Sequence, residues 1–562
     1  MQTQDWIIRR TESIAEGGMV AAKHPLAAEA GLRVLQEGGN AIDAAITTAL
    51  AMGVVEPYMS GIGGGGFMLY QDAESGESHF LDYFMPAPAN ATPDMYEIET
   101  AGATDTLGFR GVKDDANLIG HRAVGVPGLI AGAAAALERF GTISLADALA
   151  PAIGFAGDGF PVSWYTMLRI ANAMELISRF PATAEIFLKD GRFVPNADTP
   201  AGPNKLIQSD LARSMQQIAD GGSGVFYGGA VGKAIVDELS AHGNPMTLAD
   251  LTGYEAQWST PRRVTYRDGY ELVFAPNTGG TTLAETFNLL EHFSFAGMKA
   301  TDPEALHLFI EAAKIAYADR WQHLADERTV DVPWRQLESK EYARQRITDI
   351  DRAKAAVAVK AGQFGNGQAS APEGDGGCTT HLSVVDRNRN MVSITQTINM
   401  VFGSGVTAAG TGILLNDTMV LFDPNPGRAN SIAGGKRPLS SMTPMMVLKD
   451  GKPFLTVGAP GGRLIIGTVM KVIHNVIDLG MGIQEACDQV LVDASTPKIL
   501  TNAAMGEAAI AGLTAMGHDL NLRQQDFLPR LFAIPTGILV DPQTGKLHGG
   551  ADSYHPGVAI GY

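Results

Sequence analysis

The chain has 562 residues, of which 45% are hydrophobic and 18% charged, so it holds enough apolar material for a large folded core. Its formal net charge of −18 argues against nucleic acid or an anionic membrane surface as a partner. Cys378 and Cys487 are too few for a disulfide framework, and no run of about 18 apolar residues predicts a membrane span. Residues 1–6 lack the basic and apolar regions of a secretory signal, and we expect a soluble, cytoplasmic protein.

The first predicted elements are two helices followed by two strands. Residues 19–56 hold two helical patterns, and Asn40 can cap the second of them. A run of glycines at 61–66 then leads into strand-like segments at 67–70 and 80–83. The glycine run lacks the GxxxxGK[ST] pattern and precedes a strand, which argues against a phosphate-binding loop.

The middle of the chain is mainly helical. Amphipathic helical patterns dominate residues 127–325, with short strands near 263–275. A stretch rich in glycine and alanine follows at 354–378 and has little periodic apolar content. We expect a mobile loop there.

The last third of the chain alternates strands with a helix, which is predicted at 462–478. Strands are predicted at 379–386, 391–397, 445–448, 454–458 and 538–540. Because strands gather toward both ends of the chain with helices between them, the pattern predicts a layered α+β fold.

The junction between the loop at 354–378 and the next strand is a candidate site of chemistry. A hydroxyl at a strand start, here Thr379, is usually structural. Hydrolases with an N-terminal threonine, however, activate that hydroxyl with the residue's own α-amine, whose pKa is near 7.7–8.0 in model peptides. Such a threonine must first become an N-terminus, and a loop before it is a suitable place for an accessible, strained peptide bond.

The stretch TTHLSVVD (379–386) resembles the start of the small subunit in the gamma-glutamyltranspeptidase family. Further segments resemble that family in the same order, from about residue 17 to the C-terminus. They are GMVA (18–21), EGGNAIDAA (37–45), GGGGFML (63–69), YADR (317–320), GILLN (412–416), KRPLSSM (436–442) and PGG (460–462).

The resemblance implies a four-layer αββα sandwich of the N-terminal-nucleophile hydrolase type. A cut between Cys378 and Thr379 would divide one precursor into a large subunit, residues 1–378, and a small subunit, residues 379–562. The two subunits would associate as one intertwined domain. Two such heterodimers could also form a dimer, which the sequence neither supports nor excludes. The resemblance implies no cofactor and no metal.

The resemblance also assigns catalytic roles. Thr379 matches the nucleophile, and Thr397 matches a second threonine that orients its hydroxyl. Gly461 and Gly462 match the pair whose backbone N–H groups form the oxyanion hole. One such donor is worth about 10²–10³ in rate. A plain strand-to-helix turn is the alternative interpretation of these glycines.

The substrate pocket matches the family only in part. Asn399, Ser440 and Ser441 match residues that contact the α-amino and α-carboxylate groups of a gamma-glutamyl substrate.

Three other positions depart from the family pattern. Phe84 stands in place of an arginine that pairs with the α-carboxylate, Thr418 in place of a glutamine, and Leu421 in place of the acidic residue that holds the α-ammonium. Because each charge-assisted hydrogen bond is worth about 1.5–3 kcal/mol, these departures disfavour a zwitterionic head group.

The connection at 423–435 is short, so the lid loop of many family members is expected to be absent. This pattern is similar to the branch that includes glutaryl-cephalosporin acylases and oxamate amidohydrolase, whose acyl groups carry a carboxylate and need no α-amine. Arg463 is interpreted first as a solvated arginine at a helix start, and second as a cation for such a carboxylate.

The sequence therefore predicts a self-processing amide hydrolase with a small amide substrate and with water or an amine as acceptor. Gamma-glutamyl hydrolase or transferase activity on glutathione-like substrates is the rival within the family. A non-catalytic scaffold is the rival of another class. His381 is expected to form structural hydrogen bonds, since no second histidine lies at metal-ligand spacing, and a Cys378 nucleophile is disfavoured because it would leave with the large subunit.

Overall fold

The computed structural model describes residues 8–99, 111–364, 377–524 and 532–562. Residues 365–376, about half of the predicted loop at 354–378, therefore lie outside the described residues. None of the helices within the described ranges combines the length and the apolar character needed to cross a membrane.

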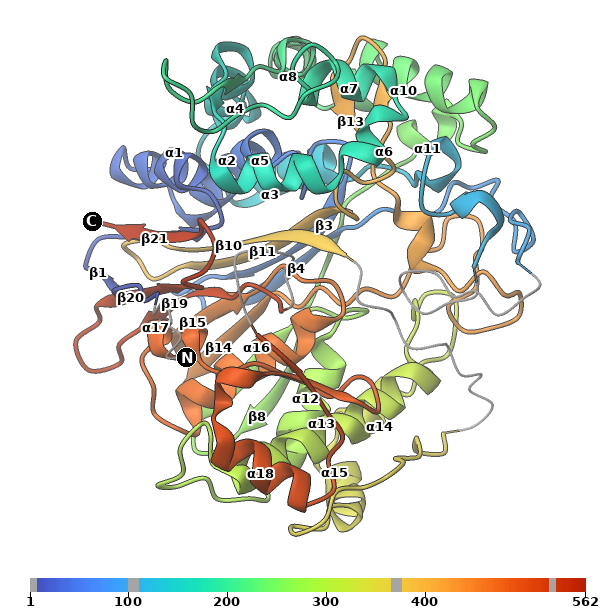
Figure 1. The fold of residues 1–562 in the computed structure, drawn as a ribbon. Coiled ribbons are helices and arrows are strands. Elements are labelled where there is room, and N and C mark those ends of the chain that lie inside the picture. The colour runs from blue at the N-terminus through green and yellow to red at the C-terminus, as the bar shows by residue number, and fades with distance from the viewer. Residues whose placement is uncertain (1–7, 100–110, 365–376, 525–531) are drawn as a thin grey trace.

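Two antiparallel seven-stranded sheets face each other in the centre of the molecule (Figure 1). In spatial order, the first sheet consists of β21 (Val558–Gly561), β2 (Met19–Ala22), β10 (Cys378–Val385), β11 (Met391–Asn399), β3 (Gly65–Gln71), β4 (Ser78–Tyr83) and β7 (Gln257–Ser259). The second consists of β1 (Ser13–Ala15), β20 (Leu547–Ala551), β19 (Thr536–Val540), β15 (Lys452–Gly458), β14 (Met445–Lys449), β9 (Tyr270–Phe274) and β8 (Arg262–Tyr266).

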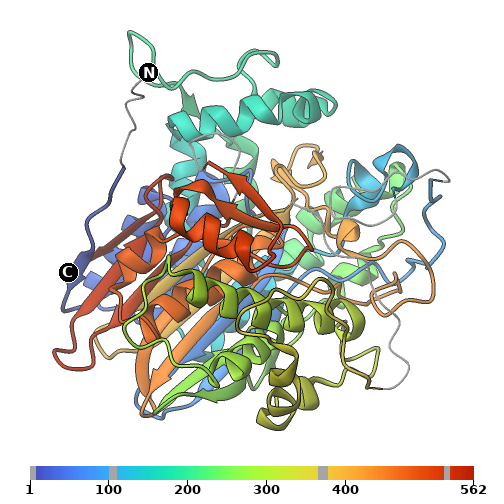
Figure 2. The ribbon, with the colours of Figure 1, turned by 60° about the horizontal axis from the view of Figure 1, so that its bottom comes forward.

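Helices cover the outer face of each sheet, so the molecule has the four αββα layers that the resemblance implies (Figures 1 and 2). Against the first sheet lie α1 (Pro25–Gln36), α2 (Ala41–Val55), α3 (Leu129–Phe140) and α5 (Trp164–Asn172). Against the second lie α12 (Gly280–Leu290), α13 (Pro303–His323), α16 (Leu464–Ile477) and α17 (Ile483–Asp488), with α18 (Glu507–Ala515) packed on α13.

Smaller elements surround these layers. Outside α2 lie α4 (Leu145–Asp158) and α8 (Ser209–Gly221). The remaining helices are α6 (Met174–Ser178), α7 (Pro181–Phe187), α9 (Gly224–Tyr227), α10 (Ala230–Ala241), α11 (Leu248–Thr252), α14 (Trp334–Leu337) and α15 (Lys340–Arg346). The remaining strands are β5 (Phe160–Pro161), β6 (Lys205–Leu206), β12 (Thr407–Ala408), β13 (Ile413–Leu414), β16 (Val492–Asp493), β17 (Ile499–Asn502) and β18 (Leu520–Arg523).

The start of the chain corrects one prediction. Met19–Ala22 is strand β2, fully buried between neighbouring strands, and the first helix begins only at Pro25. A short apolar run that is buried on both faces shows no alternation, so periodicity does not separate it from a helix. The second helix is as predicted, because Asn40 and Asp43 form a capping box at its N-terminus.

Strands β10 and β11 pair at the centre of the first sheet and present different chemistry to its two faces. Leu382 and Val384 belong to the apolar core on the helix side. The alternate residues His381 and Ser383 face the second sheet, where Ser383 Oγ lies 3.2 Å from Thr456 Oγ1. Because side chains alternate along a strand, the side chain of Thr379 is expected on the same face as His381 and Ser383, toward the second sheet.

Both predicted subunits contribute strands to each sheet. In the first sheet β2 lies between β21 and β10, and in the second sheet β14 pairs with β9. The chain therefore forms one layered unit, while the boundary between Cys378 and Thr379 stays a prediction.

Candidate active site

A small cavity beside the start of β10 gathers most of the residues that the sequence singles out. Its volume is about 30 Å³. Its lining consists of Phe84, Gly377, Thr379, Thr397, Asn399, Leu421, Ser440, Ser441, Met442, Gly462, Arg463 and Ile465. These residues come from segments far apart in the chain, so the fold brings the predicted nucleophile and the predicted pocket together.

The peptide bond before Thr379 is held by Thr397. The Thr397 hydroxyl donates a hydrogen bond to the carbonyl oxygen of Cys378, and it accepts one from Asn399 N at 2.7 Å. The pairing of β10 with β11 is irregular between Cys378 and Thr380, as is common next to active sites. Thr397 therefore withdraws electron density from the carbonyl that a hydroxyl of Thr379 would attack.

Gly461 and Gly462 lie immediately before α16, as the sequence predicts. A Cβ on Gly461 would lie 2.3 Å from the Cβ of Ala533, so no larger residue fits there. Within the described part of the chain, no backbone carbonyl accepts a hydrogen bond from either glycine N–H. These two donors at the positive end of the helix dipole can therefore hold an oxyanion.

The uncut chain itself fills this site. A Cβ on Gly377 would lie 2.7 Å from the Cα of Gly462, so the residue before Cys378 is pressed against the predicted oxyanion hole. The remaining cavity of about 30 Å³ has room for water alone, since a small-molecule site usually needs roughly 300 Å³ or more.

The walls of the cavity are apolar on one side and polar on the other. Phe84 stacks on Phe67 with ring centroids 4.9 Å apart, and Leu421 lies beside the pocket. On the polar side, Ser440 and Ser441 lie next to Asn399 around the cavity.

Two predicted residues occupy positions other than those expected. Thr418 lines no part of the cavity, because its methyl group packs against Gly125. Arg463 lines the cavity but is only 3% exposed, and its guanidinium donates to Asp493 and Ser495. The interpretation of Arg463 as a solvated arginine was therefore wrong, and Asp493 already balances its charge.

His381 has the structural role that the sequence predicts. Its ring nitrogens lie 2.9 Å from Thr395 Oγ1 and 3.1 Å from Ser383 Oγ, between the two sheets. Burial lowers the pKa of His381 to about 3, so the ring is neutral at physiological pH. Cys378 and Cys487 are both buried, and no disulfide joins them.

Two buried ionisable residues, Arg320 and Asp417, lie next to the pocket and contact residues that line it. Arg320, on α13, donates to the Ser440 carbonyl oxygen at 3.0 Å and to Ser441 Oγ at 3.4 Å. Asp417 is fully buried beside Asn399, and burial raises its pKa from 3.8 to about 8. The motif YADR contains Arg320 and the motif GILLN ends one residue before Asp417, but the sequence does not show where either side chain points.

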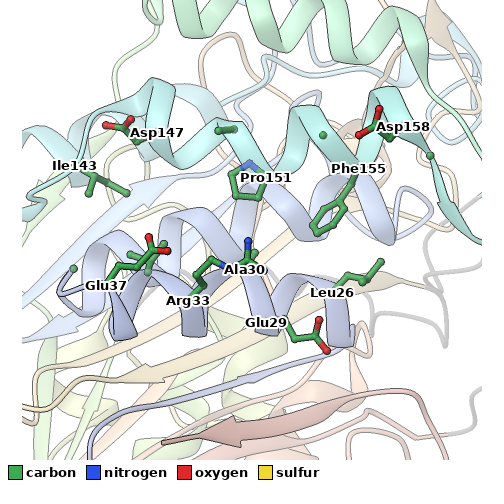
Figure 3. Close-up of a pocket in the computed structure, with 15 residues that line it drawn as sticks. Leu26, Glu29, Ala30, Arg33, Glu37, Ile143, Asp147, Pro151, Phe155 and Asp158 are labelled. Atoms are coloured by element: carbon green, nitrogen blue, oxygen red, sulfur yellow. The ribbon is translucent and has the colours of Figure 1, made fainter.

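A much larger groove lies elsewhere and is not this site. Between α1 and α4 there is a groove of about 860 Å³, which Phe155 enters from α4 (Figure 3). Its edges carry the carboxylates of Glu29, Glu37, Asp147 and Asp158 (Figure 3). None of the predicted catalytic or substrate-binding residues lines this groove. The larger of the two cavities is therefore not the candidate active site.

Comparison with known proteins agrees with this geometry. The family model described as gamma-glutamyltranspeptidase matches residues 27–562. The chain belongs to the gamma-glutamyltranspeptidase family. It is therefore a self-processing N-terminal-nucleophile hydrolase with the αββα fold of that family.

Relatives within the family carry two kinds of name. The chain is 38% identical to the "Acylase ACY 1 proenzyme" of Pseudomonas sp. (strain V22) over 92% of this chain and 89% of the relative. It is 35% identical to the "Glutathione hydrolase proenzyme" of Bacillus subtilis (strain 168) over 98% and 92%. The crystal structure of a cephalosporin acylase from Bacillus halodurans superposes with a TM-score of 0.87 at 28% identity, covering 100% of this chain and 99% of that one.

Proposed function

We propose that the protein cuts itself between Cys378 and Thr379 and then hydrolyses amides of short acyl groups that carry a carboxylate but no α-ammonium. The observation that carries the first part is the hydrogen bond from the Thr397 hydroxyl to the Cys378 carbonyl oxygen, one peptide bond from the Thr379 hydroxyl. The contrast between the apolar residues Phe84 and Leu421 and the polar residues Ser440 and Ser441 carries the second part.

The self-cut begins with attack of Thr379 Oγ on the carbonyl carbon of Cys378. The bond from that carbon to the Thr379 nitrogen breaks, the nitrogen takes the hydroxyl proton, and an ester joins Cys378 to Thr379 Oγ. Water then cleaves the ester and leaves a carboxylate on Cys378, a hydroxyl on Thr379 and a free α-amine. In the first step Thr397 stabilises the negative charge that develops on the Cys378 oxygen.

Turnover uses the groups that the cut has released. The neutral α-amine of Thr379 takes the proton of its own hydroxyl, which attacks the substrate amide carbon, while Gly461 and Gly462 donate to the oxyanion. The amine leaves with a proton, and water hydrolyses the threonyl ester by the same route. This mechanism needs no group other than those of the chain, the substrate and water.

The polar wall supports a carboxylate on the acyl group. Arg320 donates to Ser441 Oγ, which places a buried cation behind the polar wall on which a ligand carboxylate would lie. Arg463 adds little net attraction, because Asp493 is its ion-pair partner. The opposite wall offers an α-ammonium only Phe84 and Leu421, so burying that charge would be unfavourable.

Gamma-glutamyl transfer or hydrolysis is the second candidate, and the similarity to the Bacillus subtilis glutathione hydrolase favours it. It requires that residues other than Phe84 and Leu421 hold the zwitterionic head group.

A panel of p-nitroanilides separates these candidates. We expect the purified, cut enzyme to release p-nitroaniline from the glutaryl and succinyl compounds faster than from the gamma-glutamyl compound. A preference for the gamma-glutamyl compound would overturn the proposed specificity. Absence of release from every compound by fully cut protein would overturn the proposed substrate class.

A further inference from the structure

A buried cluster of charged residues lies behind the first residues of β10, on the face opposite the cavity. Lys23 Nζ lies 3.6 Å from Glu56 Oε1, and both side chains are fully buried. The Thr380 hydroxyl donates to Glu56 Oε2 at 3.3 Å, which connects this ion pair to the residue after the nucleophile. The proposed mechanism uses none of these groups.

Arg169 is the second cation of this cluster and touches the residue before the nucleophile. It lies on α5, is 8% exposed, and its Nη2 donates to the Sγ of Cys378 at 3.2 Å. The Tyr165 ring lies beside both cations, with its centroid 5.3 Å from Lys23 Nζ and 5.9 Å from the Arg169 guanidinium carbon.

The buried guanidinium of Arg169 contacts a thiol where a carboxylate would be expected. A buried arginine is normally paired with a carboxylate, because removing the charge from water is unfavourable. Within the described ranges no carboxylate forms an ion pair with Arg169, and its Nε has no hydrogen-bond partner. Its polar contact is instead with the thiol of Cys378.

We propose that Arg169 is a positioning residue for the self-cut and acts through the Cys378 side chain. This inference rests on the proposed cut between Cys378 and Thr379. Thr397 fixes the carbonyl oxygen of Cys378, and Arg169 fixes its side chain from the opposite face of the sheet. Together they restrict rotation of the scissile carbonyl, so its carbon stays in line with the Thr379 hydroxyl.

The reaction also changes the charge of the residue that Arg169 contacts. When water cleaves the ester between Cys378 and Thr379 Oγ, the Cys378 carbonyl carbon gains the water oxygen and becomes a carboxylate. One water proton goes to Thr379 Oγ and the other to the free α-amine of Thr379. A negative charge thereby appears on the residue that Arg169 contacts.

The test is the rate at which freshly purified uncut chain yields the fragment 379–562, followed by intact mass. We expect R169M and C378A each to slow the cut by at least about tenfold, since a misplacement of about 1 Å can lower a rate by 10². C378S keeps a hydrogen-bond acceptor and is the matched control, which should cut at nearly the wild-type rate. The double variant R169M/C378A should be no slower than either single variant.

A merely structural role would give different results. Arg169 lines no part of the cavity, so kcat per cut molecule should be unchanged in R169M. If R169M and C378A both cut at the wild-type rate, or if their effects multiply in the double variant, the proposal is wrong. If R169M does not fold, the comparison of C378A with C378S decides. A small fragment that begins at a residue other than Thr379 would instead overturn the proposed function.

Discussion

Asp82 and Arg437 form a buried ion pair that joins the two walls of the active site. Asp82 Oδ2 lies 2.5 Å from Arg437 Nη1, while Asp82 Oδ1 accepts a hydrogen bond from Phe84 N at 2.9 Å. Arg437 precedes the segment that ends in Ser440 and Ser441. The ion pair thus connects the backbone of Phe84, in the apolar wall, to the segment that leads to the polar wall of the pocket.

Replacing this carboxylate should weaken both folding and substrate binding. In D82N the amide still accepts from Phe84 N, but Arg437 loses its charge partner in a buried place, at a loss of about 3 kcal/mol in unfolding free energy. We expect KM for the acyl substrate to rise more than kcat falls, because the walls move apart. Denaturant unfolding and steady-state kinetics measure the two effects, and an unchanged KM would show that the pair does not set the pocket.

The Thr379 hydroxyl should be indispensable for the self-cut. T379A should remain one chain of 59.3 kDa, whereas T379S keeps a hydroxyl and should still cut, although more slowly. Intact mass under denaturing conditions distinguishes the two. A T379A sample that yields fragments of residues 1–378 and 379–562 would exclude Thr379 as the nucleophile.

The Thr397 hydroxyl should accelerate the self-cut by as much as one hydrogen-bond donor of an oxyanion hole accelerates acyl transfer. T397A should slow the appearance of the small fragment by about 10²–10³, while T397S should retain most of the rate. A time course of fragment formation provides the measurement. Equal rates for T397A and wild type would mean that the hydrogen bond to the Cys378 carbonyl has no catalytic effect.

The head-group preference should shift when charges are added to the apolar wall. The double variant F84R/L421D provides a cation for an α-carboxylate and an anion for an α-ammonium, each hydrogen bond being worth about 1.5–3 kcal/mol. We expect kcat/KM for gamma-glutamyl-p-nitroanilide to rise about tenfold or more relative to the glutaryl compound. F84L/L421N is the uncharged control, and a similar rise in it would point to pocket volume instead of charge.

Asp417 should make stability depend on pH. Its folded pKa is raised from 3.8 to about 8 by burial, so the folded state keeps a proton that the unfolded state loses as the pH rises above 4. This contribution to stability is fully present below pH 4 and is lost progressively by pH 8. The unfolding free energy of the wild type should therefore fall relative to that of D417N over this range. Parallel pH profiles for the two proteins would contradict a buried, protonated Asp417.

The strands of the site were predictable, whereas the directions of several side chains were not. β-branched residues mark β10 and β11, and the glycine pair marks the turn before α16, since these features reflect local backbone preferences. Thr418 and Arg463 match their predicted positions in sequence but turn toward Gly125 and Asp493. Those partners are remote in the chain, so only tertiary packing determines the contacts.

Arg169 had no signal in the sequence for the same reason. It lies in a short amphipathic helix, where an arginine is ordinarily solvated. Its burial depends on the packing of α5 over the start of β10. The catalytic roles of Thr379, Thr397, Gly461 and Gly462 stay predictions until the variants are measured.

The interleaving of strands has a consequence for the protein after the cut. In the first sheet β2 of the large fragment lies between β21 and β10 of the small fragment, and in the second sheet β9 of the large fragment pairs with β14 of the small fragment. Pulling the fragments apart would break ladders in the middle of both sheets and open both cores. Dilution alone should therefore not separate them, and the nicked molecule should melt in a single cooperative transition. The cut changes the connectivity of the chain and leaves the folding unit whole.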